Sequence, residues 1–157
     1  MLVKDILDVD FVNYKKASMV ISFPQCSWKC EKECGKQVCQ NSALAKVPDI
    51  EISVDKVVER YLKNGISESV VCGGLEPMDS WADLQLFVRK FREKSNDDIV
   101  IYTGYYKEEI TDKINWLKNY DNIVVKFGRF ILGHKKHYDE VLGIKLASNN
   151  QYAEVIS

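Results

Sequence analysis

"SVDKVVERYLKNGISESVVCGGLEP" (residues 53–77) contains the two kinds of segment on which the fold of this chain depends. Its first half has apolar residues at helical spacing, with Ser53 as N-cap and Gly65 as terminator. Those apolar residues are Val54, Val57, Val58, Tyr61 and Leu62. Residues 68–74, "ESVVCGG", form a short apolar run typical of a strand that is buried on both faces. The stretch therefore predicts an amphipathic helix followed by a buried strand.

The same alternation continues on both sides of this stretch. "SMVISF" (18–23) predicts an earlier strand, and a helix that begins at Ser80 carries an apolar stripe of Trp81, Leu84, Phe87, Val88 and Phe91. Further along, the patterns predict a strand over 98–104, a helix over 107–119 and a strand over 122–127. Alternating strands and helices favour right-handed βαβ units around a mostly parallel sheet. We therefore expect an α/β fold.

Chain length limits the form of this sheet. A βα unit takes roughly 30 residues, whereas a closed eight-unit barrel needs about 250 residues. The 157 residues of this chain therefore cannot form a closed barrel. We expect one domain over residues 1–157, built as an incomplete, open βα barrel of about five to six strands.

Composition excludes several classes of protein. With 22 basic and 23 acidic residues, the chain lacks the positive surface typical of nucleic-acid-binding proteins. The N-terminal "MLVKDILDVDFVNYKK" does not have the pattern of a signal peptide, and no apolar run is long enough to cross a membrane. We therefore expect a cytoplasmic protein, in which thiols stay reduced.

Four of the five cysteines lie within "SFPQCSWKCEKECGKQVCQN" (22–41), at Cys26, Cys30, Cys34 and Cys39. A disulfide framework is not favoured, since the total is odd and a chain of this size does not need one for stability. A zinc site that uses all four thiols, with His134 or His137 recruited, stays open, as does an iron–sulfur site. Cys72 lies inside an apolar strand and is interpreted as a core residue.

An unusual loop follows each predicted strand. The cysteine segment follows the first strand, and the others are followed by "GGLEP" (73–77), "TGYY" (103–106) and "GRF" (128–130). Ligands of parallel α/β proteins bind at the carboxyl ends of the strands, where such loops converge. We therefore expect these loops to form one site, although each is also an ordinary turn sequence. We expect Lys126 and Arg129 on its rim, facing solvent or a partner.

Five of these landmarks, in this order, resemble those of the radical S-adenosylmethionine (SAM) activases, in particular the anaerobic ribonucleotide reductase activating proteins. They are "CQN" (39–41), "GGLEP" (73–77), "IYTGY" (101–105), "VVKFGRF" (124–130) and "ASNNQYAEVI" (147–156). The resemblance extends from residue 8 through Asn149. It implies a [4Fe–4S] cluster held by three cysteines, with the fourth iron left for the amino and carboxylate groups of SAM. Reductive cleavage would then give methionine and a 5′-deoxyadenosyl radical.

The resemblance implies a cluster loop over 24–41 but leaves the third ligand open. The family pattern is Cys-x3-Cys-x2-Cys, which Cys26 and Cys30 begin, but Glu33 stands in the third place. Cys39 is favoured as the third ligand, because its "CQN" context matches the end of the family motif. Cys34, one place late, is the alternative.

The resemblance also implies which residues bind the cosubstrate. Gly73 and Gly74 would let the backbone approach its methionine part, and Glu76 would accept a hydrogen bond from its ammonium group. Relative to the family, the loop has one extra residue before this glutamate. The adenosine and the exit of the radical would be bordered by Thr103, Gly104 and Asn149.

The implied function is that of a radical SAM oxidoreductase of the glycyl-radical-enzyme activating type. Its expected partners are a large anaerobic ribonucleotide reductase-like enzyme and a flavodoxin-type or other low-potential electron donor. The expected docking edge consists of Tyr105, Tyr106, Lys126 and Arg129. Two alternatives stay open: a zinc- or cluster-stabilised binding module without SAM cleavage, and a radical SAM enzyme that acts on a small molecule or peptide.

Overall fold

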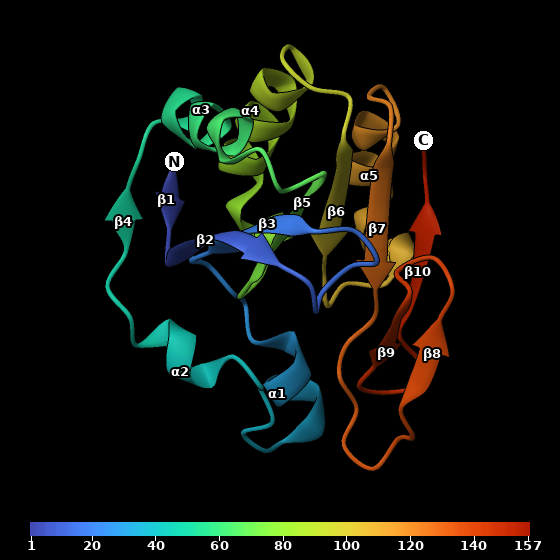
Figure 1. Cartoon of the computed structure of the whole chain (residues 1–157). Helices are drawn as coiled ribbons and strands as arrows, with labels where there is room; N and C mark the ends of the chain where they lie inside the picture. Colours follow the sequence, from blue (N-terminus) through green and yellow to red (C-terminus); the bar gives the residue numbers. More distant parts are fainter.

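A six-stranded, mostly parallel sheet forms the centre of the structure, a computed structural model that describes residues 1–157 (Figure 1). The strand order is β10–β7–β6–β5–β3–β2. The four central strands are β3 (Ser18–Phe23), β5 (Ser69–Gly74), β6 (Asp98–Tyr102) and β7 (Ile123–Phe127), and they run parallel to one another. The antiparallel edge strands are β2 (Asp5–Asp10) and β10 (Tyr152–Val155). The sheet does not close, which confirms the expected α/β class and the open, mostly parallel sheet.

Three helices cover one face of this sheet: α3 (Val54–Asn64), α4 (Trp81–Arg92) and α5 (Thr111–Leu117). Short 3₁₀ turns, η1 (Pro77–Ser80) and η2 (Lys107–Ile110), lead into the last two. Side chains alternate between the two faces of a strand, and in β5 this directs Val70 and Cys72 toward the helices. With the apolar stripes of the helices, such residues form a core of 23 buried side chains.

The opposite face of the sheet has a smaller apolar layer, to which Val71 belongs. It is partly covered by an antiparallel hairpin, β8 (His137–Asp139) and β9 (Ile144–Leu146). The seven buried residues of this layer are Tyr14, Val71, Val100, Val124, Leu142, Leu146 and Ala153. This face is therefore less filled than the helical face.

The cysteine segment lies beyond the carboxyl end of β3 (Figure 1). It contains two short helices, α1 (Lys29–Cys34) and α2 (Ser42–Ala45), neither of which has a buried residue. A two-stranded ladder of β1 (Leu2–Val3) and β4 (Ile50–Glu51) then leads the chain back toward α3. No helix is both long and apolar enough to span a membrane.

The sequence predictions hold best for α3. The Ser53 side chain accepts a hydrogen bond from the Lys56 N–H (3.3 Å), and Gly65 ends the helix at a φ of 66°. Four of the five apolar residues of the predicted helix are buried, and the fifth, Leu62, is 50% exposed. Ser80 makes no side-chain cap, since η1 runs directly into α4.

Candidate functional site

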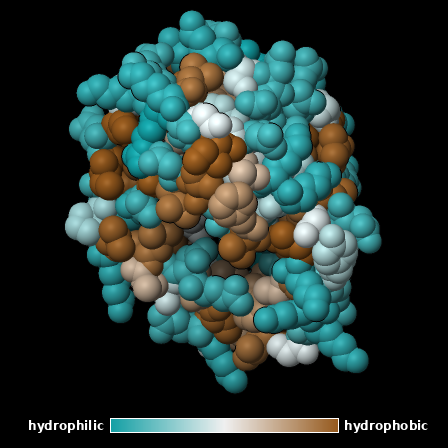
Figure 2. All heavy atoms as spheres, viewed as in Figure 1, coloured by the Kyte–Doolittle hydropathy of each residue, from teal (hydrophilic) through white to brown (hydrophobic).

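A cavity of about 490 Å³ lies at the carboxyl edge of the parallel strands. Figure 2 shows the hollow between the sheet and the cysteine segment. Residues from the cysteine segment and from the ends of β5, β6, β7 and β9 line it, so the loops expected to converge do form one site. A second depression, of about 370 Å³, is lined by polar and charged side chains of β2 and α3 alone. Binding sites combine apolar walls with a few polar groups, so the larger cavity is the candidate site.

Most of the residues expected from the sequence line this cavity. They are Cys26, Cys30, Cys39, Gly73, Gly74, Glu76, Thr103 and Gly104. Cys34 and Asn149 do not line it, and Asn149 is exposed. Cys72 is fully buried in β5, where burial raises the pKa of its thiol.

Both ends of the cysteine segment are attached to the "GGLEP" loop. After β3, the N–H groups of Leu75 and Glu76 donate to the carbonyls of Phe23 (3.1 Å) and Gln25 (2.8 Å). At the other end, the Asn41 side-chain amide donates to the Gly74 carbonyl (2.7 Å). These contacts bring the start and the end of the cysteine segment to the same loop.

Gly74 is required by close packing of two strands. Its φ is +86°, and a Cβ atom there would lie 2.7 Å from the Cα atom of Ser22. A side chain would therefore force β3 and β5 apart. At Gly73 the nearest atom to an added Cβ is 3.9 Å away, so this residue is not needed for packing.

The three cavity-lining thiols influence one another electrostatically, and all five cysteines are free of disulfides. Burial raises the pKa of Cys26 to about 11, and negative charge on Cys30 contributes. Burial also raises the pKa of Cys30, and Cys39 is the next contributor. Each thiol therefore lies within electrostatic range of the next.

This set of thiols fits the expected cluster. No three His, Cys, Asp or Glu side chains are arranged to hold a single metal ion. A [4Fe–4S] cluster has a different requirement, because each cysteine thiolate binds a separate iron atom. Three free thiols around one cavity, with Cys34 outside it, match a three-cysteine donor set.

Glu76 is a buried acid in the wall of the cavity, with 5% of its surface exposed. Its carboxylate accepts hydrogen bonds from the N–H groups of Met78 (3.0 Å) and Gly104 (2.8 Å). Burial raises its pKa to about 7, although these hydrogen bonds oppose the shift. A carboxylate can accept about four hydrogen bonds, so capacity is left for a ligand.

Lys126 brings a buried cation to the same cavity. Its ammonium group donates to the Gly128 carbonyl (2.8 Å), and burial lowers its pKa to about 8. Lys126 and Arg129 are only 7% and 2% exposed, so the expectation that both stand on an accessible rim was wrong. For Lys126, the sequence signal that could have shown its burial is its place inside the apolar strand "NIVVKF" (122–127).

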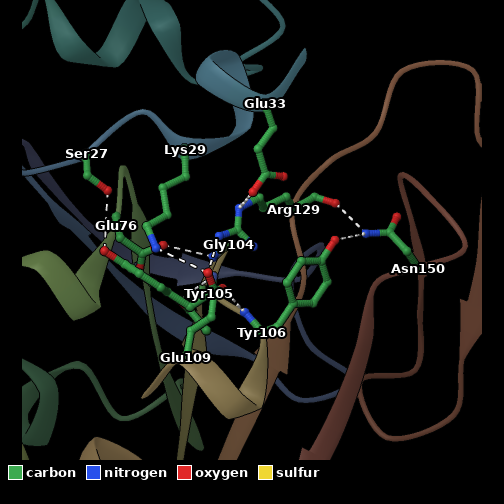
Figure 3. Close-up of polar contacts among 11 residues, drawn as sticks. Ser27, Lys29, Glu33, Glu76, Gly104, Tyr105, Tyr106, Glu109, Arg129 and Asn150 are labelled. Carbon is green, nitrogen blue, oxygen red and sulfur yellow. Dashed lines mark hydrogen bonds and ion pairs between the residues drawn. The ribbon is translucent and has the colours of Figure 1, made fainter. Parts of the chain in front are cut away.

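Polar contacts that the sequence did not predict connect the cysteine segment to the loops opposite (Figure 3). Asp79 accepts hydrogen bonds from the Ser27 N–H (2.6 Å) and the Tyr105 hydroxyl (2.5 Å). The Tyr105 hydroxyl also lies 3.3 Å from the Ser27 hydroxyl. Tyr105 therefore contacts the cysteine segment of its own chain, which leaves it less available as a docking residue.

A comparison with protein families identifies the class of this site. Residues 16–153 match the family model described as "4Fe-4S single cluster domain", which covers more than half of the chain. Comparisons with curated proteins and with solved structures give no match. The matched region includes all four cysteines of the segment and every strand that lines the cavity. The chain therefore belongs to the 4Fe-4S single cluster domain family.

Proposed function

We propose that this protein is a radical SAM enzyme that holds its [4Fe–4S] cluster through Cys26, Cys30 and Cys39. The observation that carries the proposal is that these three thiols line the same cavity as the "GGLEP" loop and the end of β6. A cluster with three protein ligands supplies an open iron position and an electron for reductive cleavage of the cosubstrate. In this proposal the open sheet is an incomplete βα barrel.

The residues of the chain bind the methionine part of SAM in the following way. The Glu76 carboxylate accepts a hydrogen bond from the ammonium group, whose charge also favours the ionised form of this acid. Lys126 supplies the positive charge for the carboxylate group. The backbone at Gly73 and the loop of Thr103 and Gly104 complete the walls of the cavity.

The proposed target is a glycine of a large partner enzyme of the anaerobic ribonucleotide reductase type, with a low-potential donor such as a flavodoxin. The support is the resemblance of the loops together with the sheet, which does not close into a barrel around the cavity and so leaves a carbon radical there to be shielded from water by something else. A partner that covers the cavity would provide this shielding. Lys126 and Arg129 are removed from the proposed docking edge, because both are buried.

Reconstitution tests the cluster and the cosubstrate. Anaerobic incubation with iron and sulfide, followed by dithionite and SAM, should yield 5′-deoxyadenosine. The Cys26→Ala, Cys30→Ala and Cys39→Ala variants should lose the cluster and the product, whereas Cys34→Ala and Cys72→Ala should keep both. Stoichiometric zinc without a cluster would favour the binding module, and loss of the cluster in Cys34→Ala alone would reverse the choice of third ligand.

The target needs a separate measurement. Mixing the reconstituted protein with a glycyl radical enzyme under reducing, oxygen-free conditions should give a glycine-centred radical in that enzyme. Its electron paramagnetic resonance (EPR) doublet should collapse when the glycine carries deuterium at Cα. Efficient turnover of a small metabolite by the isolated protein, with no radical on a partner, would contradict the proposal.

A further inference from the structure

Helix α1, which carries Cys30, lacks an apolar anchor to the rest of the molecule. It has six residues, none of them buried, and no side chain caps its N-terminus. Helices this short depend on tertiary contacts, because their own hydrogen bonds cannot stabilise them in water. Something other than apolar burial must therefore hold Cys30 at the cavity.

Two charged side chains on one face of α1 provide such contacts. Lys29 and Glu33 are four residues apart, which places them on the same side of the helix. The Lys29 ammonium donates to the Glu109 carboxylate (3.2 Å), and Glu33 pairs with Nε of Arg129 at 3.1 Å. Arg129 in turn donates through Nη2 to Glu109 (2.6 Å). Figure 3 shows this chain of alternating charges, which we name the charge clamp: Lys29, Glu109, Arg129 and Glu33.

The two sides of the charge clamp differ in burial. The Arg129 side chain is 2% exposed, and its guanidinium group lies 4.8 Å from the centre of the Tyr106 ring. Glu109 also accepts a hydrogen bond from the Tyr106 N–H (2.8 Å). In contrast, the Lys29 and Glu33 side chains on α1 are 38% and 59% exposed. Arg129 and Glu109 thus form a fixed base to which the exposed face of α1 attaches.

We propose that Arg129 is a positioning residue for the cluster: through Glu33 and Glu109 it fixes α1 and thereby the thiol of Cys30. This inference rests on the proposed function, because it assumes that the thiols hold a cluster. Loss of Arg129 removes the only basic partner of Glu33 and the buried partner of Glu109, so only the Lys29–Glu109 ion pair of the charge clamp is left. The Cys30 thiol is then held less firmly relative to Cys26 and Cys39.

The first part of the test does not depend on the cluster. In the apoprotein, Arg129→Met should raise the hydrogen-exchange rates of the α1 amides about tenfold, while those of the central strands stay unchanged. Glu33→Gln, at an exposed position, should give a smaller rise and covers the case in which Arg129→Met fails to fold. Lys32→Met is the matched control, because Lys32 is exposed on the same helix and its side chain makes no hydrogen bond or ion pair.

The second part uses the reconstituted protein. Arg129→Met should alter the EPR spectrum of the reduced cluster and lower its iron content, and Arg129→Lys, which keeps the charge, should restore part of both. Unchanged α1 exchange in Arg129→Met and Glu33→Gln, or faster exchange with a wild-type cluster spectrum, would overturn the positioning role. If wild-type protein takes up no cluster, both the proposed function and the positioning role of Arg129 are wrong. The hydrogen-exchange measurement still tests whether the charge clamp fixes α1.

Discussion

The helical face of the sheet and the cysteine segment are held in place by different forces. The helical face buries 23 apolar side chains, while α1 and α2 bury none. The cysteine segment is attached instead by hydrogen bonds and ion pairs to residues far away in the sequence. Apolar burial supplies most of the free energy that stabilises the fold. A single polar contact contributes little free energy, but it fixes the orientation of the groups that it joins. We conclude that substitutions can alter the stability of the fold and the position of the cysteine segment separately.

The largest expected effect comes from the core. Phe91 is fully buried, with its ring 4.8 Å from that of Tyr61 and 5.4 Å from that of Phe87. Phe91→Ala should lower the free energy of unfolding by about 3–5 kcal/mol, as measured by urea denaturation of the apoprotein. Leu62→Ala is the control on the neighbouring helix and should cost less than about 1 kcal/mol, since half of this side chain is exposed. Equal losses in the two variants would remove the distinction between core and surface.

The second effect is a pH dependence caused by Glu76. Its pKa is about 7 in the folded protein and about 4.3 in an unfolded chain. The folded state therefore binds this proton more tightly, and the stability it contributes is full below the unfolded value. That contribution is lost as pH rises from the unfolded value through about 7, by at most about 1.4 kcal/mol per pH unit and about 4 kcal/mol in total.

Urea denaturation of the apoprotein between pH 5 and 7 measures this effect. The wild-type protein should lose stability over this range, and Glu76→Gln should not. Lys126, whose pKa is lowered to about 8, titrates above the range and does not interfere. Parallel profiles of the two proteins would show that Glu76 is not the group responsible.

The sequence predicted the parts of the fold in which apolar residues are continuous or recur at a regular spacing. The four parallel strands and α3 have continuous or periodic apolar residues, and all were found within about two residues of their bounds. The edge strands β2 and β10 and the β8–β9 hairpin were missed, because they are short or carry charged residues. For β2, "DILDVD" (5–10) mixes acids with apolar residues, and only its pairing with β3 makes it a strand.

The site was predictable only where a motif marked it. The cysteines and the glycines of "GGLEP" were found from their spacing and their position after strands. Asp79, Glu109 and the buried state of Arg129 were not, because each takes its role from a partner elsewhere in the chain. Nothing in the local sequence around these residues indicates such a pairing.

A third and smaller effect on stability is expected at Gly74, which ends β5 next to the cavity. Gly74→Ala should cost about 1–3 kcal/mol, because alanine is strained at a φ of +86° and its Cβ would meet the backbone of Ser22. Gly73→Ala, one residue earlier in β5, should be tolerated in the apoprotein. Urea denaturation of both variants compares them, and equal stability of the two would contradict the close approach of β3 and β5.

The smallest effect on stability should come from Asn41, whose side chain makes one hydrogen bond, to the Gly74 carbonyl (2.7 Å). This contact is exposed, so Asn41→Ala should change the free energy of unfolding by less than about 1 kcal/mol. Local opening of the segment is more sensitive, since a loss of about 1 kcal/mol raises the open population about fivefold. Alkylation of Cys39 in the apoprotein, followed by mass spectrometry, should therefore speed up by as much as this factor. Gln37→Ala, an exposed amide without a contact in the same segment, should leave the rate unchanged. If Asn41→Ala instead lowered the urea midpoint as much as Phe91→Ala does, the cysteine segment would be part of the core, and the two regions would not be separable.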